Sequence, residues 1–198
     1  MSDREASNVR WHQGAVSRHD RSLASTRSGC TIWLTGYSGS GKSTIAHALE
    51  AQLVSSGRAA YTLDGDNVRF GLNADLGFSP EERAENVRRV GEVARLMADA
   101  GVVAIAPLIS PYTEGRVEVR RAHTEAGLPF YLVHVSTPLE ACEARDTKGL
   151  YAKARQGEIK DFTGINAPYE APINPDLAID TTVVHLEDAV ASVMALFD

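Results

Sequence analysis

Continuous apolar runs alternate along this chain with longer stretches in which apolar residues recur every three or four positions. The runs at 31–35, 102–106 and 130–135 are typical of strands buried on both faces of a parallel sheet. Shorter runs at 59–63 and 177–179 predict further strands. Helical spacing, with its start and stop signals, predicts helices at 42–56, 80–100, 114–126, 138–144 and 186–197.

The clearest helix start lies at Ser79. A serine in the N-cap position is followed by Pro80 at the first helical position and by two acidic residues, Glu81 and Glu82, that complement the helix dipole. Gly101 ends the same stretch. These local signals place the first turns of a long helix immediately after Phe78.

Strands that alternate with helices over most of the chain predict a doubly wound, mostly parallel α/β sheet in three αβα layers. Residues 1–29 are polar and lack periodicity, so we expect a partly ordered lead-in to a single domain at 30–198. The stretch at 146–175 interrupts the alternation with basic, glycine and proline residues. It is too long for an ordinary connection, which makes it a candidate mobile lid.

A glycine-rich segment joins the first predicted strand to the first predicted helix. It fits the phosphate-loop pattern G-x-x-x-x-G-K-[ST] in the strand–loop–helix context that the pattern requires. Backbone N–H groups would cradle phosphate oxygens, Lys42 would neutralise the β- and γ-phosphates, and Ser43 would ligate Mg²⁺. The sequence therefore predicts a phosphotransferase that uses ATP and Mg²⁺. The expected nucleotide contacts are Gly36, Tyr37, Ser38, Gly39, Ser40, Gly41, Lys42, Ser43 and Thr44.

Two carboxylates, Asp64 and Asp66, follow the second predicted strand and should lie at the same sheet edge as the glycine-rich segment. One could orient the magnesium ion, which we assign to Asp64, and the other could accept a proton. Turn chemistry around Gly65 is the alternative explanation for the same tripeptide.

Arginines and aromatic residues supply candidates for a second ligand. Arg83 and Asn86 are three positions apart on one helix face, outside its apolar stripe, and could grip an anionic substrate. Phe78 and Phe162 lie in predicted loops, where they either stack on a base or pack into the core. The remaining helical arginines are predicted to lie on solvated faces: Arg88, Arg89, Arg95, Arg116, Arg120 and Arg121.

Composition narrows the class of partner. The 198 residues carry a formal net charge of −6, which argues against binding of nucleic acid, and there is no apolar stretch long enough to span a membrane. The N-terminus has no run typical of a signal peptide, so we expect a cytoplasmic protein. Cys30 and Cys142 indicate neither a disulfide framework nor a zinc site, and the histidines show no metal-ligand spacing.

Seven motifs occur in order and carry a more specific resemblance. They are GYSGSGKST, LDGDNVRFGLN, DLGF, ENVRRVGEVA, LISPY, CEARDTKGLY and FTGINAPYEAP. Taken together, from about Val9 to the last helix, the chain resembles adenylylsulfate kinases. The resemblance implies transfer of the γ-phosphoryl group of ATP to the 3′-hydroxyl of adenosine 5′-phosphosulfate, which gives 3′-phosphoadenosine 5′-phosphosulfate and ADP in sulfate assimilation.

The resemblance also implies roles for individual residues. Asp66 would engage the 3′-hydroxyl, and Ser110 is the position that forms a phosphoserine in bacterial members. Two departures are Tyr37 and Phe70, where leucine and histidine are frequent. The implied substrate contacts are Asp66, Arg69, Phe78, Arg83, Asn86, Ile109, Ser110, Lys148 and Phe162, with Phe78 and Phe162 on either side of the substrate adenine, Lys148 near the phosphates and Arg145 against the adenine of ATP.

Two other functions stay open at this point. The chain could be a P-loop kinase for another small acceptor, such as a nucleoside monophosphate or a sugar acid. It could also be a catalytically silent nucleotide-binding module that regulates an ATP sulfurylase, although Lys42, Asp66 and Arg83 are all present. For an active kinase we expect a homodimer and a possible association with ATP sulfurylase.

Overall fold

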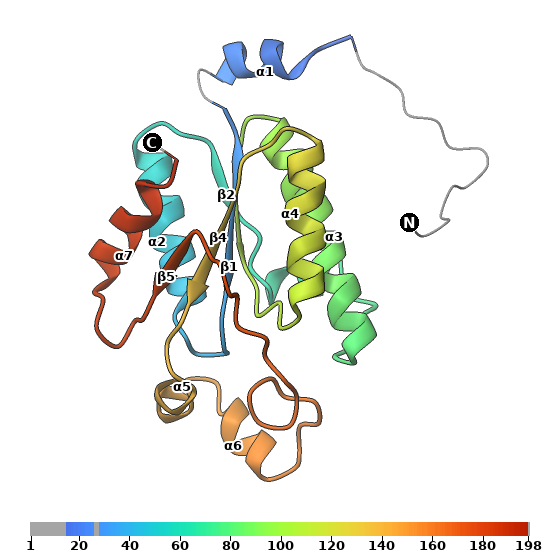
Figure 1. The fold of residues 1–198 in the computed structure, drawn as a ribbon, viewed down its shortest axis with the longest axis vertical. Coiled ribbons are helices and arrows are strands. Elements are labelled where there is room, and N and C mark those ends of the chain that lie inside the picture. The colour runs from blue at the N-terminus through green and yellow to red at the C-terminus, as the bar shows by residue number, and fades with distance from the viewer. Residues whose placement is uncertain (1–14, 26–27, 198) are drawn as a thin grey trace, which may run out of the picture.

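The fold is a parallel sheet between two helical layers (Figure 1). The computed structural model describes residues 15–25 and 28–197. Its strands lie in the order β2-β3-β1-β4-β5, and every strand pair among the described residues is parallel. This confirms the predicted doubly wound sheet. The strands are β1 (Cys30–Thr35), β2 (Ala60–Thr62), β3 (Val103–Pro107), β4 (Phe130–Val135) and β5 (Leu177–Ile179).

Each face of the sheet is covered by one pair of helices (Figure 1). On one face lie α2 (Lys42–Ser55) and α7 (Leu186–Met194), and on the other α3 (Pro80–Asp99) and α4 (Thr113–Glu125). Along β1, Ile32 and Leu34 pack toward α2 and α7, whereas Trp33 packs toward α3 and α4. Since both faces of the strand are covered, its sequence is apolar without alternation.

The strand order fixes where a ligand can bind. β1 lies between β3 and β4, so the chain builds one side of the sheet first and then crosses to the other. In open parallel sheets, such a switch point leaves a crevice beyond the carboxyl ends of the strands. The glycine-rich loop follows β1 directly and therefore lies at this crevice.

The start of α3 matches its sequence signals. Ser79 is the N-cap: its side chain accepts a hydrogen bond from the backbone N–H of Glu82 at 3.2 Å, and Glu82 Oε2 accepts one from the N–H of Ser79 at 3.0 Å. This reciprocal capping box satisfies two amides that would otherwise lack partners at the helix end. It fixes the direction in which Arg83 and Asn86 leave the first turns of α3.

Most other predicted helix and strand ends hold within one residue. The last helix is an exception, because α7 ends at Met194 and not at residue 197. A short 3₁₀ helix, η1 (Asn67–Phe70), was not predicted. None of the described helices is long and apolar enough to cross a membrane.

The N-terminal region contains a helix that the sequence did not predict, α1 (Arg18–Ser25). Arg18 Nε pairs with Asp99 Oδ1 at 2.9 Å, and Arg21 pairs with the other oxygen of the same carboxylate. Arg18 also donates to the carbonyl of Gly127 at 2.9 Å, just beyond α4. These partners are distant in sequence and therefore invisible to local periodicity. The rest of the predicted lead-in, at 1–14 and 26–27, lies outside the described residues.

The stretch at 146–175 also contains an unpredicted helix, α6 (Leu150–Arg155), which follows α5 (Leu139–Arg145). Tyr151 and Phe162 form a small apolar cluster with Cys142, separate from the two clusters that flank the sheet. The Tyr151 hydroxyl donates to the carbonyl of Ser38 at 2.9 Å. This stretch therefore folds on its own small core and is fastened to the glycine-rich loop.

Candidate active site

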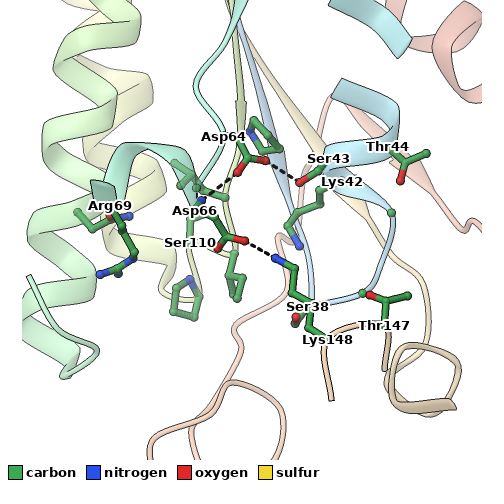
Figure 2. Close-up of a pocket in the computed structure, with 18 of the residues that line it drawn as sticks. Ser38, Lys42, Ser43, Thr44, Asp64, Asp66, Arg69, Ser110, Thr147 and Lys148 are labelled. Atoms are coloured by element: carbon green, nitrogen blue, oxygen red, sulfur yellow. Dashed lines mark hydrogen bonds and ion pairs between the residues drawn. The ribbon is translucent and has the colours of Figure 1, made fainter. Parts of the chain in front are cut away.

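A cavity of about 380 Å³ opens beyond the carboxyl ends of β1, β2 and β3 (Figure 2). Its wall comes from the glycine-rich loop, the segment after β2, the start of α3, the loop after β3 and the beginning of the 146–175 stretch. The predicted site residues that line it are Ser38, Gly39, Gly41, Lys42, Ser43, Thr44, Asp64, Asp66, Arg69, Phe78, Arg83, Asn86, Ile109, Ser110, Arg145 and Lys148.

The glycines shape the loop through close approach and unusual dihedral angles. A Cβ atom on Gly36 would lie 2.4 Å from the carbonyl oxygen of Val135 in β4. Gly39 and Gly41 have φ of 73° and 101°, a region that favours glycine. No described side chain caps α2, whose N-cap is Gly41. The first amides of α2 therefore keep their capacity to bind an anion.

Lys42 is buried within this loop, with 8% of the residue exposed. Its ammonium group donates to the carbonyl oxygens of Gly36 and Tyr37, at 3.0 and 2.6 Å. Burial lowers the pKa of Lys42 to about 8, with a further lowering by Lys148 and an opposing effect of Asp64. A desolvated cation at this point is a strong electrostatic partner for phosphate.

The two carboxylates after β2 take part in the turn around Gly65 and also reach residues beyond it. Asp64 Oδ1 accepts the backbone N–H of Asp66 at 3.0 Å, which is turn chemistry. Its other oxygen, Oδ2, accepts the hydroxyl of Ser43 at 2.9 Å (Figure 2). Asp66 forms an ion pair with Lys148, which reaches across from the 146–175 stretch. The turn thus orients one carboxylate toward Ser43 and the other toward the cavity.

Cations and an exposed ring form the side of the cavity next to α3. The guanidinium groups of Arg69 and Arg83 lie 4.3 and 5.5 Å from the centre of the Phe78 ring. Burial lowers the pKa of both arginines, although both remain cations. Asn86 is buried and accepts a hydrogen bond from the side-chain amide of Asn73 at 3.0 Å. Arg83 also donates to the carbonyl of Asp161 at 2.6 Å, which connects α3 to the 146–175 stretch.

The loop after β3 presents Ser110 to the cavity. Ser110 has φ of 38°, an uncommon conformation for a residue other than glycine, and only 3% of it is exposed. Its hydroxyl oxygen accepts the indole N–H of Trp33 at 3.1 Å. The preceding carbonyl, of Ile109, accepts the hydroxyl of Thr35 at 2.6 Å. A buried network therefore holds this loop in a fixed conformation.

Sequence reasoning missed two threonines that support the glycine-rich loop. The hydroxyls of Thr137 and Thr181 both donate to the carbonyl of Ser40 at 3.0 Å. Arg145 donates to the Thr181 hydroxyl at 2.7 Å, so it is tied to the same point. Thr137 and Thr181 lie two positions after the ends of the predicted strands at 130–135 and 177–179. The rule that selected Asp64 and Asp66, polar residues beyond the carboxyl end of a strand, could have found both.

Four predicted residues do not line the cavity: Gly36, Tyr37, Ser40 and Phe162. Phe162 is 8% exposed and packs edge-on against Tyr151, with 5.0 Å between ring centres. In the structure Phe162 packs in a small apolar core, which is one of its two possible roles. Base stacking by Phe162 stays a prediction. Tyr37 is partly buried and packs on Tyr169, with 4.8 Å between the ring centres.

The prediction of a solvated position is wrong for Arg116. Only 3% of this residue is exposed, and its guanidinium donates to the carbonyls of Ser110 and Glu170, each at 2.5 Å. Helical position alone could not reveal these acceptors, since both lie outside α4. The other helical arginines form ion pairs with acidic side chains near the surface: Arg88, Arg89, Arg95, Arg120 and Arg121.

One cavity thus holds a phosphate-binding loop and, opposite it, a second group of cations beside an exposed aromatic ring. Such a cavity offers two separate groups of hydrogen-bond donors and positive charge to anionic ligands, and Asp66 lines the same cavity. Together with the parallel sheet, this arrangement defines a P-loop kinase, which transfers a phosphoryl group from ATP to a second small molecule.

Comparison with known proteins specifies the family. A family model described as adenylylsulphate kinase matches residues 28–180. The adenylyl-sulfate kinase of Lactiplantibacillus plantarum is 53% identical over 190 residues, which cover 96% of this chain and 91% of the relative. The adenylyl-sulfate kinase of Saccharomyces cerevisiae is 52% identical over 183 residues, which cover 92% of this chain and 90% of the relative.

A solved structure agrees with these sequences. The APS kinase of Mycobacterium tuberculosis in complex with AMPPNP and APS matches with a TM-score of 0.83 and 51% identity, over 86% of this chain and 98% of that chain. The chain belongs to the adenylylsulphate kinase family. The resemblance inferred from the sequence motifs is confirmed.

Proposed function

We propose that this cavity transfers the γ-phosphoryl group of ATP to the 3′-hydroxyl of adenosine 5′-phosphosulfate, giving 3′-phosphoadenosine 5′-phosphosulfate and ADP. The observation that carries the proposal is the pairing of two different anion sites in one cavity, the glycine-rich loop and the Arg69–Phe78–Arg83 group. An exposed aromatic ring close to two guanidinium groups suits a nucleotide with a charged tail. A sugar acid has no planar base to stack there.

The donor site belongs to the glycine-rich loop. The amides at the start of α2, which no described side chain caps, and the buried ammonium group of Lys42 bind the phosphates of ATP. Arg145, held by Thr181, lies against the adenine. The other proposed nucleotide contacts are Gly36, Tyr37, Ser38, Gly39, Ser40, Gly41, Ser43 and Thr44.

Mg²⁺ fits beside the donor site. The Ser43 hydroxyl and the Asp64 carboxylate lie 2.9 Å apart, and hard oxygen ligands of this kind suit Mg²⁺, which usually takes one or two protein oxygens together with phosphates and waters. When bound, the ion neutralises charge on the phosphates. The turn around Gly65 holds Asp64 in place for this role through the hydrogen bond from the N–H of Asp66.

The acceptor site lies on the α3 side. Arg69, Arg83 and Asn86 grip the phosphosulfate nucleotide, and Asp66 hydrogen-bonds the 3′-hydroxyl and accepts its proton. Phe78 and Phe162 enclose the adenine, Ile109 and Ser110 border the substrate, and Lys148 approaches the phosphates.

The stretch at 146–175 is proposed to act as a mobile lid on the 30–198 domain. Its polar contacts with the acceptor side include the ion pair of Lys148 with Asp66 and the hydrogen bond from Arg83 to the carbonyl of Asp161. The first is an ion pair between exposed side chains, which contributes little stability and is easily exchanged for substrate contacts. A homodimer, an association with ATP sulfurylase and a cytoplasmic location remain predictions of the sequence.

The acceptor is tested by offering one candidate at a time. Purified protein with ATP and Mg²⁺ is incubated with adenosine 5′-phosphosulfate, AMP or gluconate, and release of ADP is followed. We expect ADP release above background with adenosine 5′-phosphosulfate alone. Equal or faster release with AMP or gluconate would assign the cavity to another small acceptor, and no release with any of them would favour a nucleotide-binding module without activity.

Phe78→Ala should weaken the acceptor site selectively. Loss of one base-stacking contact costs about 1–3 kcal/mol, so the KM for adenosine 5′-phosphosulfate should rise about 5- to 150-fold while the KM for ATP stays close to that of the wild type. Phe162→Ala should have the same kinetic effect if the lid brings this ring onto the base. If Phe162→Ala lowers the melting temperature and leaves both KM values unchanged, core packing is its only role.

A further inference from the structure

Within the 146–175 stretch, after the turn at 162–166, the chain runs back toward β5 (Figure 1). We call residues 167–170 of this path the return segment. It contains Tyr169, whose ring lies against Tyr37 of the glycine-rich loop, and Glu170, whose backbone N–H donates to the carbonyl of Pro111 at 2.8 Å. The return segment therefore contacts both the donor loop and the loop after β3.

Three successive carbonyls of the loop after β3 receive hydrogen bonds from outside that loop. Ile109 accepts from the Thr35 hydroxyl at 2.6 Å, Ser110 from the Arg116 guanidinium at 2.5 Å, and Pro111 from the Glu170 N–H. The positive φ of Ser110 is unfavourable for a residue with a side chain, so this conformation persists only where the surroundings enforce it. These three bonds supply that enforcement.

Arg116 connects two of the three anchor points. One arm of its guanidinium reaches Ser110 and the other reaches the carbonyl of Glu170, while its centre lies 5.9 Å from the centre of the Tyr169 ring. A rigid planar fork with donors on both arms can bridge two carbonyls in this way, whereas a lysine ammonium on a flexible stem cannot hold the same geometry. At 3% exposure, the bridge is shielded from water.

Tyr169 connects to the third anchor point. Because the Thr35 hydroxyl donates to Ile109, the contact of 3.0 Å between the Tyr169 and Thr35 hydroxyls has Tyr169 as the donor. The same ring packs on Tyr37 at 4.8 Å and on His134 at 6.0 Å. Aromatic contacts on the donor side thus fix the position of Tyr169. Its hydroxyl group then holds Thr35, which in turn donates to the carbonyl of Ile109 on the acceptor side.

We propose that Arg116 and Tyr169 are positioning residues for the phosphoryl acceptor. Neither lines the cavity, and both act through the backbone of residues 109–111, which carries Ile109 and Ser110 into the acceptor side of the cavity. The inference rests on the proposed function, since it takes this side of the cavity as the acceptor site. It assigns to Arg116 a role in binding geometry beyond its contribution to folding.

The test compares the kinetics of variants that remain folded. Arg116→Met removes both donated hydrogen bonds with little change in volume, Arg116→Lys retains the charge without the fork, and Tyr169→Phe removes only the hydroxyl. Arg121→Gln is the matched control, because this residue of the same helix is exposed and, among the described residues, its ion pairs are those with Glu118 and Glu125 on the surface. Steady-state KM is measured separately for ATP and for adenosine 5′-phosphosulfate well below the melting temperature.

We expect Arg116→Met to lower kcat/KM for the acceptor by about 10- to 100-fold, the scale associated with a misplacement of about 1 Å, with the KM for ATP changed less than about twofold. The kcat/KM of Arg116→Lys for the acceptor should lie between those of Arg116→Met and the wild type. Tyr169→Phe should lower kcat/KM for the acceptor by a smaller factor, and Arg121→Gln should leave it unchanged. The proposal would be overturned if folded Arg116→Met had an unchanged kcat/KM for the acceptor. It would also be overturned if kcat/KM fell by the same factor for the acceptor and for ATP. If Arg116→Met does not fold, Tyr169→Phe decides by the same criterion.

Hydrogen exchange separates this inference from the proposed function. The peptide that spans residues 108–112 should exchange faster in Arg116→Met than in the wild type, while the peptide that spans the first turns of α2 should not. This readout does not depend on the identity of the acceptor. Wild-type protein that is inactive on adenosine 5′-phosphosulfate would overturn the proposed function only, whereas unchanged exchange at 108–112 would overturn the positioning role.

Discussion

Replacing Lys42 with alanine should lower kcat by a factor on the order of 10²–10³, the scale seen when one preorganised electrostatic contact to a developing charge is lost. Lys42 is the buried cation of the glycine-rich loop, and in phosphoryl transfer the protein contributes mainly through position and charge. The fold should survive, because the variant removes the desolvation cost of a buried charge. This gain offsets the loss of the hydrogen bonds from Lys42 to two loop carbonyls.

Turnover at saturating ATP, with circular dichroism to verify the fold, measures this effect. Lys153→Ala is the control, since this exposed lysine lies on α6 outside the cavity lining. Wild-type turnover in a folded Lys42→Ala protein would remove the glycine-rich loop from the mechanism.

The lowered pKa of Lys42 predicts that kcat/KM for ATP depends on pH. Burial holds the pKa of its ammonium group at about 8, so the group is charged below that pH and neutral above it. Since kcat/KM reports the protonation state of the free enzyme, kcat/KM for ATP should fall as the pH rises through about 8. A profile that stays flat to about pH 10 would show that the loop binds phosphate without this charge.

The parts of the site that could be predicted from sequence are those fixed by neighbours in the chain. The glycine-rich loop and the capping box at Ser79 depend on hydrogen bonds between residues a few positions apart, so their spacing alone identifies them. Asp64 was found because a polar residue directly after a predicted strand of a parallel sheet lies at the carboxyl edge of that sheet. The order of the strands then brings these local features into one cavity.

Features that depend on distant partners could not be predicted in this way. Arg116 has the spacing of a solvent-facing arginine, yet one of its acceptors is the carbonyl of Glu170, which is 54 positions away. The same holds for α1, where Arg18 meets Asp99 across 81 positions. A carbonyl acceptor carries no side-chain signature, so nothing in the sequence distinguishes such an arginine from those on the surface.

Phe162 shows a different limit. From the sequence, an aromatic residue in a predicted loop could either stack on a base or pack into the core. The surrounding stretch contains a helix and an apolar cluster in which the ring packs. Short segments of this kind acquire their core from a few residues of mixed spacing, among them Cys142 and Tyr151. Their burial follows from packing within the stretch, which neither period 2 nor period 3.6 reveals.

The second large effect concerns Asp66, in comparison with Ser110. Asp66→Asn should lose a factor on the order of 10² or more in kcat, because an amide cannot accept the proton of the 3′-hydroxyl as a carboxylate can. Its ion pair with Lys148 is exposed, so the variant should keep its stability. Lys148→Ala breaks the same ion pair and leaves the carboxylate in place, but it also removes the proposed contact of Lys148 with the phosphates. Its loss of kcat therefore sets an upper bound on what the ion pair itself contributes.

Ser110→Ala should keep most of the turnover. A serine hydroxyl is a weak nucleophile unless a base lies within hydrogen-bond reach, and the contact described for the Ser110 hydroxyl is with the indole N–H of Trp33, which is a donor. The variant should instead lose about 1–3 kcal/mol of stability, because Trp33 is left buried without its acceptor. A chemical denaturation curve measures that loss independently of activity.

Steady-state rates of the two variants, together with the stereochemical course at a chiral γ-phosphorus, decide between the two routes. Direct transfer to the acceptor is a single in-line displacement and inverts the configuration at phosphorus, whereas a phosphoserine intermediate requires two displacements and retains it. We expect inversion, a slow Asp66→Asn and an active Ser110→Ala, since phosphoryl transfer needs little covalent assistance once the reactants are aligned and their charge is neutralised. An inactive but folded Ser110→Ala beside an active Asp66→Asn, or net retention at phosphorus, would make Ser110 the nucleophile and reduce Asp66 to a partner of Lys148.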